Sequence, residues 1–136
     1  MPTLTRWFIK SAMLYLVAAL ILSIAMQSPL RGQAPFLVIV WPTYLHLLVL
    51  GWLTQLIFGV ALWLFPKHSP ARPRGSDLLG WATFFLLNLG LILRTILEPW
   101  PTLGAPRGAL LILGAAAQLA AGWLFVINTW PRVRER

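Results

Sequence analysis

The sequence predicts an all-α membrane protein, a bundle of four transmembrane helices that forms a single domain over residues 1–136. Hydrophobic residues make up 59% of the chain and charged residues only 10%, whereas soluble domains carry about 25% charged residues. Four apolar runs, separated by turns rich in proline and glycine, are each long enough to cross a hydrocarbon core of about 30 Å as a helix. They lack the alternating pattern of a transmembrane barrel strand. Cysteine is absent, which excludes disulfides and thiolate metal sites.

Prolines mark the ends of the first two predicted helices. The first helix covers residues 8–26, after a short basic segment, and a loop with several prolines ends it. The second helix covers residues 43–65. It begins directly after Pro42, which suits the first turn of a helix because its missing N–H has no partner there. Pro66 ends this helix at the start of the basic turn KHSPARPRGS.

The third and fourth helices are predicted over residues 78–97 and 108–130. Ser76 and Asp77 are equally good candidates to cap the third helix, because both side chains can accept a hydrogen bond from a free backbone N–H. A turn with several prolines and glycines separates the two helices. The basic tail that follows, PRVRER, is expected to fray.

The distribution of lysine and arginine orients the bundle. The N-terminus, the 67–76 loop and the C-terminal tail hold eight such residues, and the two opposite loops hold two. Because the excess of lysine and arginine lies on the cytoplasmic side, both termini are expected in the cytoplasm of a bacterial-type inner (plasma) membrane. The net charge of +8 lies beside helix ends, so we expect contact with lipid headgroups and no nucleic-acid partner. The two groups are Arg6, Lys10, Lys67, Arg72, Arg74, Arg132, Arg134 and Arg136, against Arg31 and Arg107.

A Gly-x3-Gln-x3-Gly pattern occurs in both the second and the fourth helix. Small residues four apart let helices approach closely, and a buried glutamine can donate hydrogen bonds across the contact. Two interpretations stay open, a parallel repeat of two related helical hairpins and chance similarity between helices rich in glycine and alanine. The residues of the pattern are Gly51, Gln55, Gly59, Gly114, Gln118 and Gly122.

His46 is the principal candidate for chemistry, about one turn inside the outer end of the second helix. An ionisable residue inside a membrane span is a functional hypothesis by default, and the alternative is an interfacial histidine bonded to a backbone carbonyl. At 100° per residue, His46 is expected to point roughly opposite to Gln55. Arg94 lies at about the same depth on the third helix. It suits either an anion clamp for a carboxylate or heme propionate or a simple pair with Glu98 at i+4.

Two other observations narrow the function. His68 is 22 residues beyond His46, or about 33 Å if the segment is helical, so we expect it to be a solvated surface residue. A single intramembrane histidine cannot build a multi-histidine copper or non-heme iron centre within one chain. No carboxylate lies in the middle of a span, which argues against a proton- or cation-coupled transporter.

The segment HLLVLGWLTQLIFGVALWLFP and the following RGSDLLGWATFFLLNLGLILRTILEP resemble part of the heme–copper oxidase large-subunit (subunit I-like) superfamily, particularly its short relatives, over roughly residues 41–98. In that superfamily an early helix carries a histidine that ligates low-spin heme, then a Gly-aromatic step and a proline at the cytoplasmic end. The matching positions are His46, Gly51, Trp52 and Pro66. The oxidases have twelve or more helices and further histidine ligands that this chain lacks, so the resemblance implies heme binding rather than oxygen reduction.

We therefore expect a b-type heme-binding protein for electron transfer or small-gas binding, rather than an enzyme, with His46 as axial ligand of the heme iron and Arg94 as propionate partner. The sixth ligand stays open between Met26, Met13, a water and His46 of a second copy. Four helices make a narrow core, which favours a site at a subunit interface. The expected partners are the lipid bilayer and a homodimer or larger homo-oligomer. The alternative function is a cofactor-free accessory or assembly subunit of a larger membrane complex.

Overall fold

The computed structural model describes residues 1–34, 36–66 and 74–133, and this part of the chain contains helices and no strand. Four of its helices are long and apolar enough to span a membrane: Thr3–Gln27, Trp41–Leu64, Asp77–Leu97 and Pro106–Arg132. The predicted all-α membrane fold with four spanning helices is thereby confirmed. The elements are α1 (Thr3–Gln27), η1 (Pro29–Gly32), α2 (Phe36–Ile39), α3 (Trp41–His46), the π-helix η2 (Leu47–Thr54), α4 (Gln55–Leu64), α5 (Asp77–Leu97), η3 (Pro101–Leu103), α6 (Ala105–Thr129) and η4 (Trp130–Arg132).

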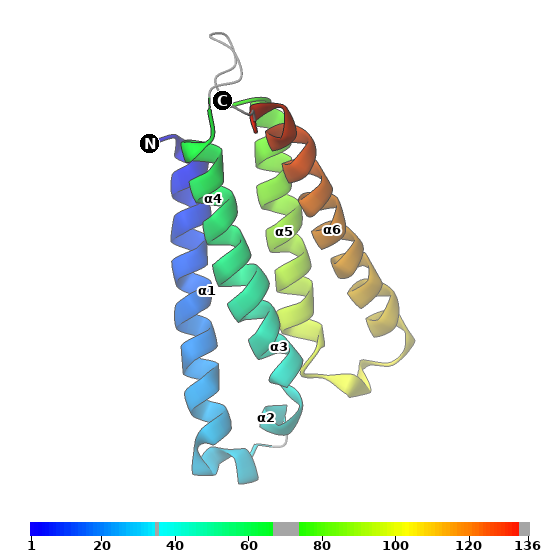
Figure 1. Ribbon diagram of the computed structural model, residues 1–136. Helices are drawn as coiled ribbons and strands as arrows, with labels where there is room; N and C mark the ends of the chain where they lie inside the picture. The colour runs from blue at the N-terminus through cyan, green and yellow to red at the C-terminus, as the bar shows by residue number, and fades with distance from the viewer. Residues whose placement is uncertain (35, 67–73, 134–136) are drawn as a thin grey trace.

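The second span is one continuous rod made of α3, η2 and α4, and the other spans pack around it and α5. In Figure 1, α1 lies beside this rod, α5 lies next to α4, and α6 runs along α5 on the far side from α1. The core between the helices contains Phe8, whose ring meets that of Phe84 edge-on with centroids 5.1 Å apart. This contact joins α1 to α5. The start of α1 and the end of α6 lie at the same end of the bundle (Figure 1); which side of the membrane that end faces stays a prediction.

Two predicted boundaries are corrected at the N-terminal and C-terminal ends. The basic segment with Arg6 and Lys10 forms the first turns of α1, which begins at Thr3 directly after the extended Pro2. The tail does not fray over its first residues, because η4 continues from α6 and the side chain of Arg132 is buried. Residues 134–136 lie outside the described part of the chain.

Arg132 fastens the end of the fourth span to the end of the second. Its guanidinium donates from Nη2 to the carbonyl oxygens of Leu62 (3.1 Å) and Phe65 (2.8 Å) and from Nε to that of Pro66 (3.0 Å). Nη1 donates to the carbonyl oxygen of Arg74 at 3.4 Å. The last carbonyl oxygens of a helix have no partner within the helix, so Arg132 donates the hydrogen bonds that they would otherwise lack at the end of α4.

The start of α5 is held to α6 in a similar way. Ser76 is the N-cap, and its Oγ accepts a hydrogen bond from the backbone N–H of Leu79. Asn128 of α6 in turn accepts from the backbone N–H of Ser76 at 2.8 Å and donates to its carbonyl oxygen at 3.2 Å. Of the two predicted caps, Ser76 is therefore the one that the structure uses.

The glycines of the two Gly-x3-Gln-x3-Gly patterns have different neighbours. A Cβ added at Gly51 would lie 2.8 Å from the Cβ of Tyr15, and one at Gly59 would lie 2.8 Å from the Cβ of Phe8, so both glycines pack against α1. In α6, Gly114 packs against α5, while nothing lies within 4 Å of a Cβ added at Gly122. The two patterns therefore serve different contacts, and the internal repeat stays a prediction.

The close approach of α1 to η2 makes Gly51 sensitive to the smallest substitution. We expect Gly51→Ala to lower the free energy of unfolding by about 1–3 kcal/mol, because overpacking forces the backbone to shift. The matched control is Gly108→Ala in α6, where a Cβ meets nothing within 4 Å. Thermal unfolding in detergent measures both variants, and equal stability of the two would contradict the close contact.

Candidate functional site

The carboxylate of Glu98 is the centre of a polar cluster at the end of the bundle opposite the start of α1 (Figure 1). Its Oε1 lies 3.0 Å and its Oε2 3.2 Å from Nδ1 of His46. Nη1 of Arg94 donates to Oε1 at 2.9 Å, and the hydroxyl of Thr43 donates to Oε2 at 3.0 Å. The side chain of Glu98 is 9% exposed and that of His46 27% exposed. The cluster thus brings together His46 and Arg94, two of the residues predicted from sequence.

Local helix geometry explains half of this arrangement. Arg94 and Glu98 are four residues apart at the end of α5, so their side chains share a face. Thr43 and His46 are three residues apart on α3, and they also share a face. The contact between these two faces is tertiary. The sequence predicts Glu98 only as the i+4 partner of Arg94, and Thr43 is not among the predicted site residues. The shared depth of Thr43 and Glu98 is the signal that could pair them, because polar groups inside a membrane need partners.

Arg94 links this cluster to α6. Its Nε donates to Oε1 of Gln118 at 3.1 Å, while its Nη1 holds Glu98. The other amide atom of Gln118, Nε2, is buried and has no hydrogen-bond partner among the described residues. Arg94 is therefore the i+4 partner of Glu98 and lies in the same cluster as His46; its role as an anion clamp for a heme propionate stays a prediction.

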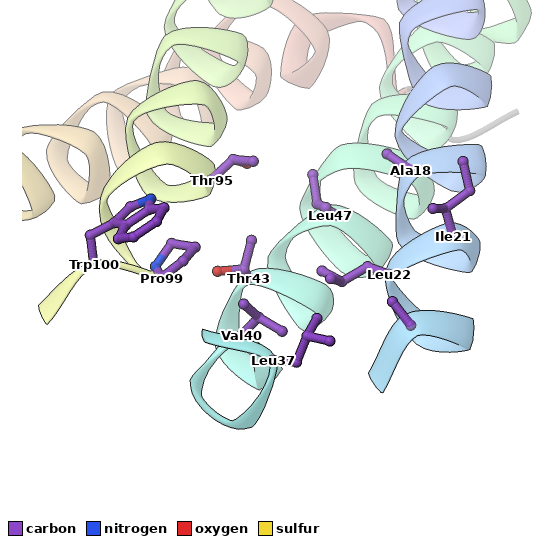
Figure 2. A pocket seen from close by; sticks show the side chains of 11 residues that line it. Ala18, Ile21, Leu22, Leu37, Val40, Thr43, Leu47, Thr95, Pro99 and Trp100 are labelled. Carbon is purple, nitrogen blue, oxygen red and sulfur yellow. The ribbon is translucent and has the colours of Figure 1, made fainter. Parts of the chain in front are cut away.

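Two apolar hollows each include one residue of this hydrogen-bond network, Thr43 in the first and Gln118 in the second, and His46 itself lines neither of them. The first, of about 480 Å³, lies between α1, α2, α3 and the end of α5, and Thr43 forms part of its wall (Figure 2). The second, of about 700 Å³, is a groove between α4 and α6 that includes Gln118. The chain of hydrogen bonds Thr43–Glu98–Arg94–Gln118 therefore reaches from one hollow to the other. The groove is lined by Phe58, Gln118, Leu119, Gly122, Trp123, Phe125 and Val126.

The π-helix η2 starts directly after His46 and changes the direction of the side chains that follow. Its i→i+5 hydrogen bonds put more residues into each turn. Successive side chains are therefore rotated about the helix axis by less than the 100° of an α-helix. As a result His46 and Gln55 both face α5, where they bind Glu98 and Asn88. The prediction that His46 points opposite to Gln55 is wrong for this reason.

Asn88 is the centre of a second network of hydrogen bonds, deeper in the bundle. Its Oδ1 accepts from the hydroxyl of Tyr15 at 2.8 Å and from Nε2 of Gln55 at 3.3 Å. Its Nδ2 donates to the carbonyl oxygen of Phe84 at 2.8 Å and to Oε1 of Gln55 at 3.4 Å. Gln55 is fully buried. These bonds join α1, α4 and α5 and have a structural role.

The other candidate ligands lie on α1 or outside the described residues. Met26 is half-buried in the last turn of α1, and its role as a ligand stays a prediction. Met13 is exposed on α1. His68 lies outside the described residues. In residues 1–34, 36–66 and 74–133, no group of three or more His, Asp or Glu side chains is placed to hold a metal ion.

Comparisons with protein-family models, with curated proteins and with solved structures find no match to this chain. The similarity to heme–copper oxidase large subunits therefore stays a resemblance in sequence pattern.

Proposed function

We propose that this chain is an integral membrane protein that binds b-type heme through Nε2 of His46 and serves electron transfer or the binding of a small gas. The observation that carries the proposal is the hydrogen bonding of the two ring nitrogens. Nδ1 is hydrogen-bonded to the largely buried carboxylate of Glu98, and Nε2 has no hydrogen-bond partner among the described residues. Histidines that ligate metals commonly donate their other ring N–H to such a carboxylate.

An apolar hollow, as a macrocycle requires, begins beside Thr43 and Leu47, which flank His46 along the second span. The groove between α4 and α6 is also apolar, and Gly122 leaves open space in it. The buried, unpartnered Nε2 of Gln118 is a donor at the same groove. Nη1 and Nε of Arg94 donate to Glu98 and Gln118. A guanidinium has five N–H groups, so Arg94 retains N–H groups that can bind a propionate, and we propose it as the propionate partner. When bound, heme supplies one-electron exchange or a coordination position for a gas.

A second axial ligand is the least complete part of the site. Met26 is half-buried in the last turn of α1 and stays a proposed ligand, and Met13 is exposed on the same helix. A water or a second copy of the chain can also supply the second ligand, the latter in a homodimer or larger homo-oligomer within the bilayer. In a twofold dimer the same surface patch lies on both sides of the axis, so His46 of each copy can approach one heme.

We also propose that the protein lies in a bacterial-type inner membrane with both termini in the cytoplasm. The end of the bundle where α1 begins and α6 ends (Figure 1) carries Arg6, Lys10, Arg74 and Arg132 among its described residues. The opposite end carries the Glu98 cluster and Arg107. Positive charge marks the cytoplasmic side, so His46 would face the outer leaflet.

The test of the proposal is a visible spectrum of the detergent-purified protein, oxidised and dithionite-reduced, with and without added heme. A Soret band with sharp α and β bands on reduction is the expected result. A protein that stays colourless after heme has been added would overturn the proposal.

A second candidate function is a cofactor-free assembly subunit, and the exposed face of α6 favours it. Gly122 has open space in front of it, and large apolar side chains such as Leu119 and Trp123 are exposed beside it. Small residues at such a position allow another helix to approach closely. Gly51 and Gly59 do not belong to this face, because they pack inside the chain against α1.

The assembly function predicts that Gly122→Leu converts a larger complex into the 15.3 kDa monomer, because a leucine side chain blocks the close approach of another helix. Light scattering after size-exclusion chromatography in detergent measures the change. Gly108→Leu, at another open position of α6, is the control that should keep the complex. A wild-type protein that is already monomeric would count against this function.

A further inference from the structure

We infer that Glu98 is the positioning residue of His46, and that it fixes the imidazole as the Nδ1–H tautomer with the lone pair of Nε2 free for a ligand. The identity of that ligand as heme iron rests on the proposed function. The tautomer and its cause do not, because they follow from the contacts of Glu98 within this chain.

The donor and acceptor properties of the two groups decide the tautomer. A neutral imidazole has one N–H and one nitrogen lone pair, and an ionised carboxylate can only accept. Both oxygens of Glu98 lie within hydrogen-bond distance of Nδ1, at 3.0 and 3.2 Å. The proton must therefore be on Nδ1, and Nε2 presents its lone pair. In the other tautomer two acceptors would face each other without a proton between them.

The carboxylate is itself fixed from several sides. The hydroxyl of Thr43 and Nη1 of Arg94 both donate to it, and the positive charge of Arg94 balances its negative charge at a depth where a lone carboxylate is costly. Arg107 holds the backbone at the same place, with Nε donating to the carbonyl oxygen of Leu97 at 2.9 Å and Nη2 to that of Glu98 at 3.3 Å. Because Glu98 has little freedom, the ring bonded to it has a set orientation.

Nitrogen-15 NMR of the heme-free protein, labelled on histidine and kept in alkaline buffer, tests the tautomer directly. The chain has two histidines, and the His46→Ala variant identifies the signal of His46. We expect His46 to carry its proton on Nδ1 in the wild type and to become a mixture of tautomers in Glu98→Gln. A wild-type spectrum with the proton on Nε2 would overturn the inference without any need for the variant to fold.

Heme binding supplies a second measurement. Loss of such an outer partner typically costs about 10–100-fold in metal affinity, so we expect Glu98→Gln to weaken heme binding by about that factor. The reduction potential should rise, because the imidazole loses the negative acceptor that increases its basicity. Thr83→Val is the matched control, since it removes a threonine hydroxyl that donates to the carbonyl oxygen of Leu79 within α5, outside the Glu98 cluster; it should retain the wild-type affinity and potential.

The outcomes separate this inference from the proposed function. If the wild type binds heme and Glu98→Gln binds it with unchanged affinity and potential, Glu98 does not position His46, although the heme proposal stands. If the wild type binds no heme, the proposed function fails, and the NMR experiment still decides the tautomer.

Discussion

Replacing His46 by alanine is expected to abolish the heme spectrum of the purified protein and to leave the helical bundle folded. The substitution removes the proposed axial ligand, so no b-type α band should appear after reduction. The structural cost should be small, because among the described residues the side chain of His46 is hydrogen-bonded only to Glu98, and it is already 27% exposed. One hydrogen bond contributes about 1 kcal/mol to stability, and Thr43 and Arg94 still satisfy the carboxylate.

The difference between reduced and oxidised spectra measures this loss, and two controls make it specific. His68→Ala should keep the full spectrum. Imidazole added to the His46→Ala variant should restore part of it, since a free ligand can occupy the place of the missing ring. An unchanged heme content in His46→Ala would show that another residue ligates the iron.

Arg132→Ala is expected to produce the largest loss of stability. The buried guanidinium donates to four carbonyl oxygens of the second span and of the segment that follows it. Hydrogen bonds to charged groups contribute about 1.5–3 kcal/mol each. Water in the detergent micelle replaces some of these bonds, so we expect a net loss of about 3 kcal/mol and a melting temperature about 10 °C lower.

Arg6→Ala is the matched control for Arg132→Ala, because it removes the same charge from an exposed position at the same end of the bundle. It should unfold at nearly the wild-type temperature. If both variants lose the same stability, the effect would come from net charge, and the role of Arg132 as a fastening between spans would be wrong. Circular dichroism during heating in detergent distinguishes the two results.

The membrane fold could be predicted from the sequence because the bilayer imposes it. Apolar runs of sufficient length must be helices, and the prolines at residues 42 and 66 show where the second span begins and ends. The start of α1 was placed five residues late, at residue 8 instead of Thr3, because hydropathy detects the lipid-facing part of a helix rather than its end. The sequence predicts a frayed tail where Arg132 is in fact buried, since the partners of Arg132 are backbone carbonyls, which have no signature in the sequence.

Only part of the candidate site could be predicted. The Arg94–Glu98 pair follows from i,i+4 spacing within one helix. The bond from Glu98 to His46 joins residues 52 positions apart, and no periodicity contains that information. The π-helix could not be predicted either, because a helical wheel assumes the same rotation for every residue. A wheel without η2 therefore places His46 opposite to Gln55, although both side chains face α5.

The position of Asn88 has a consequence for how the chain assembles in the bilayer. The two spans made first carry the hydroxyl of Tyr15 and the amide of Gln55, and both side chains bond to Asn88 of α5. A hairpin of α1 and the second span alone lacks this partner for both polar groups. Asn88 of α5 satisfies both of them. We therefore expect the insertion of α5 to favour the native order of the helices.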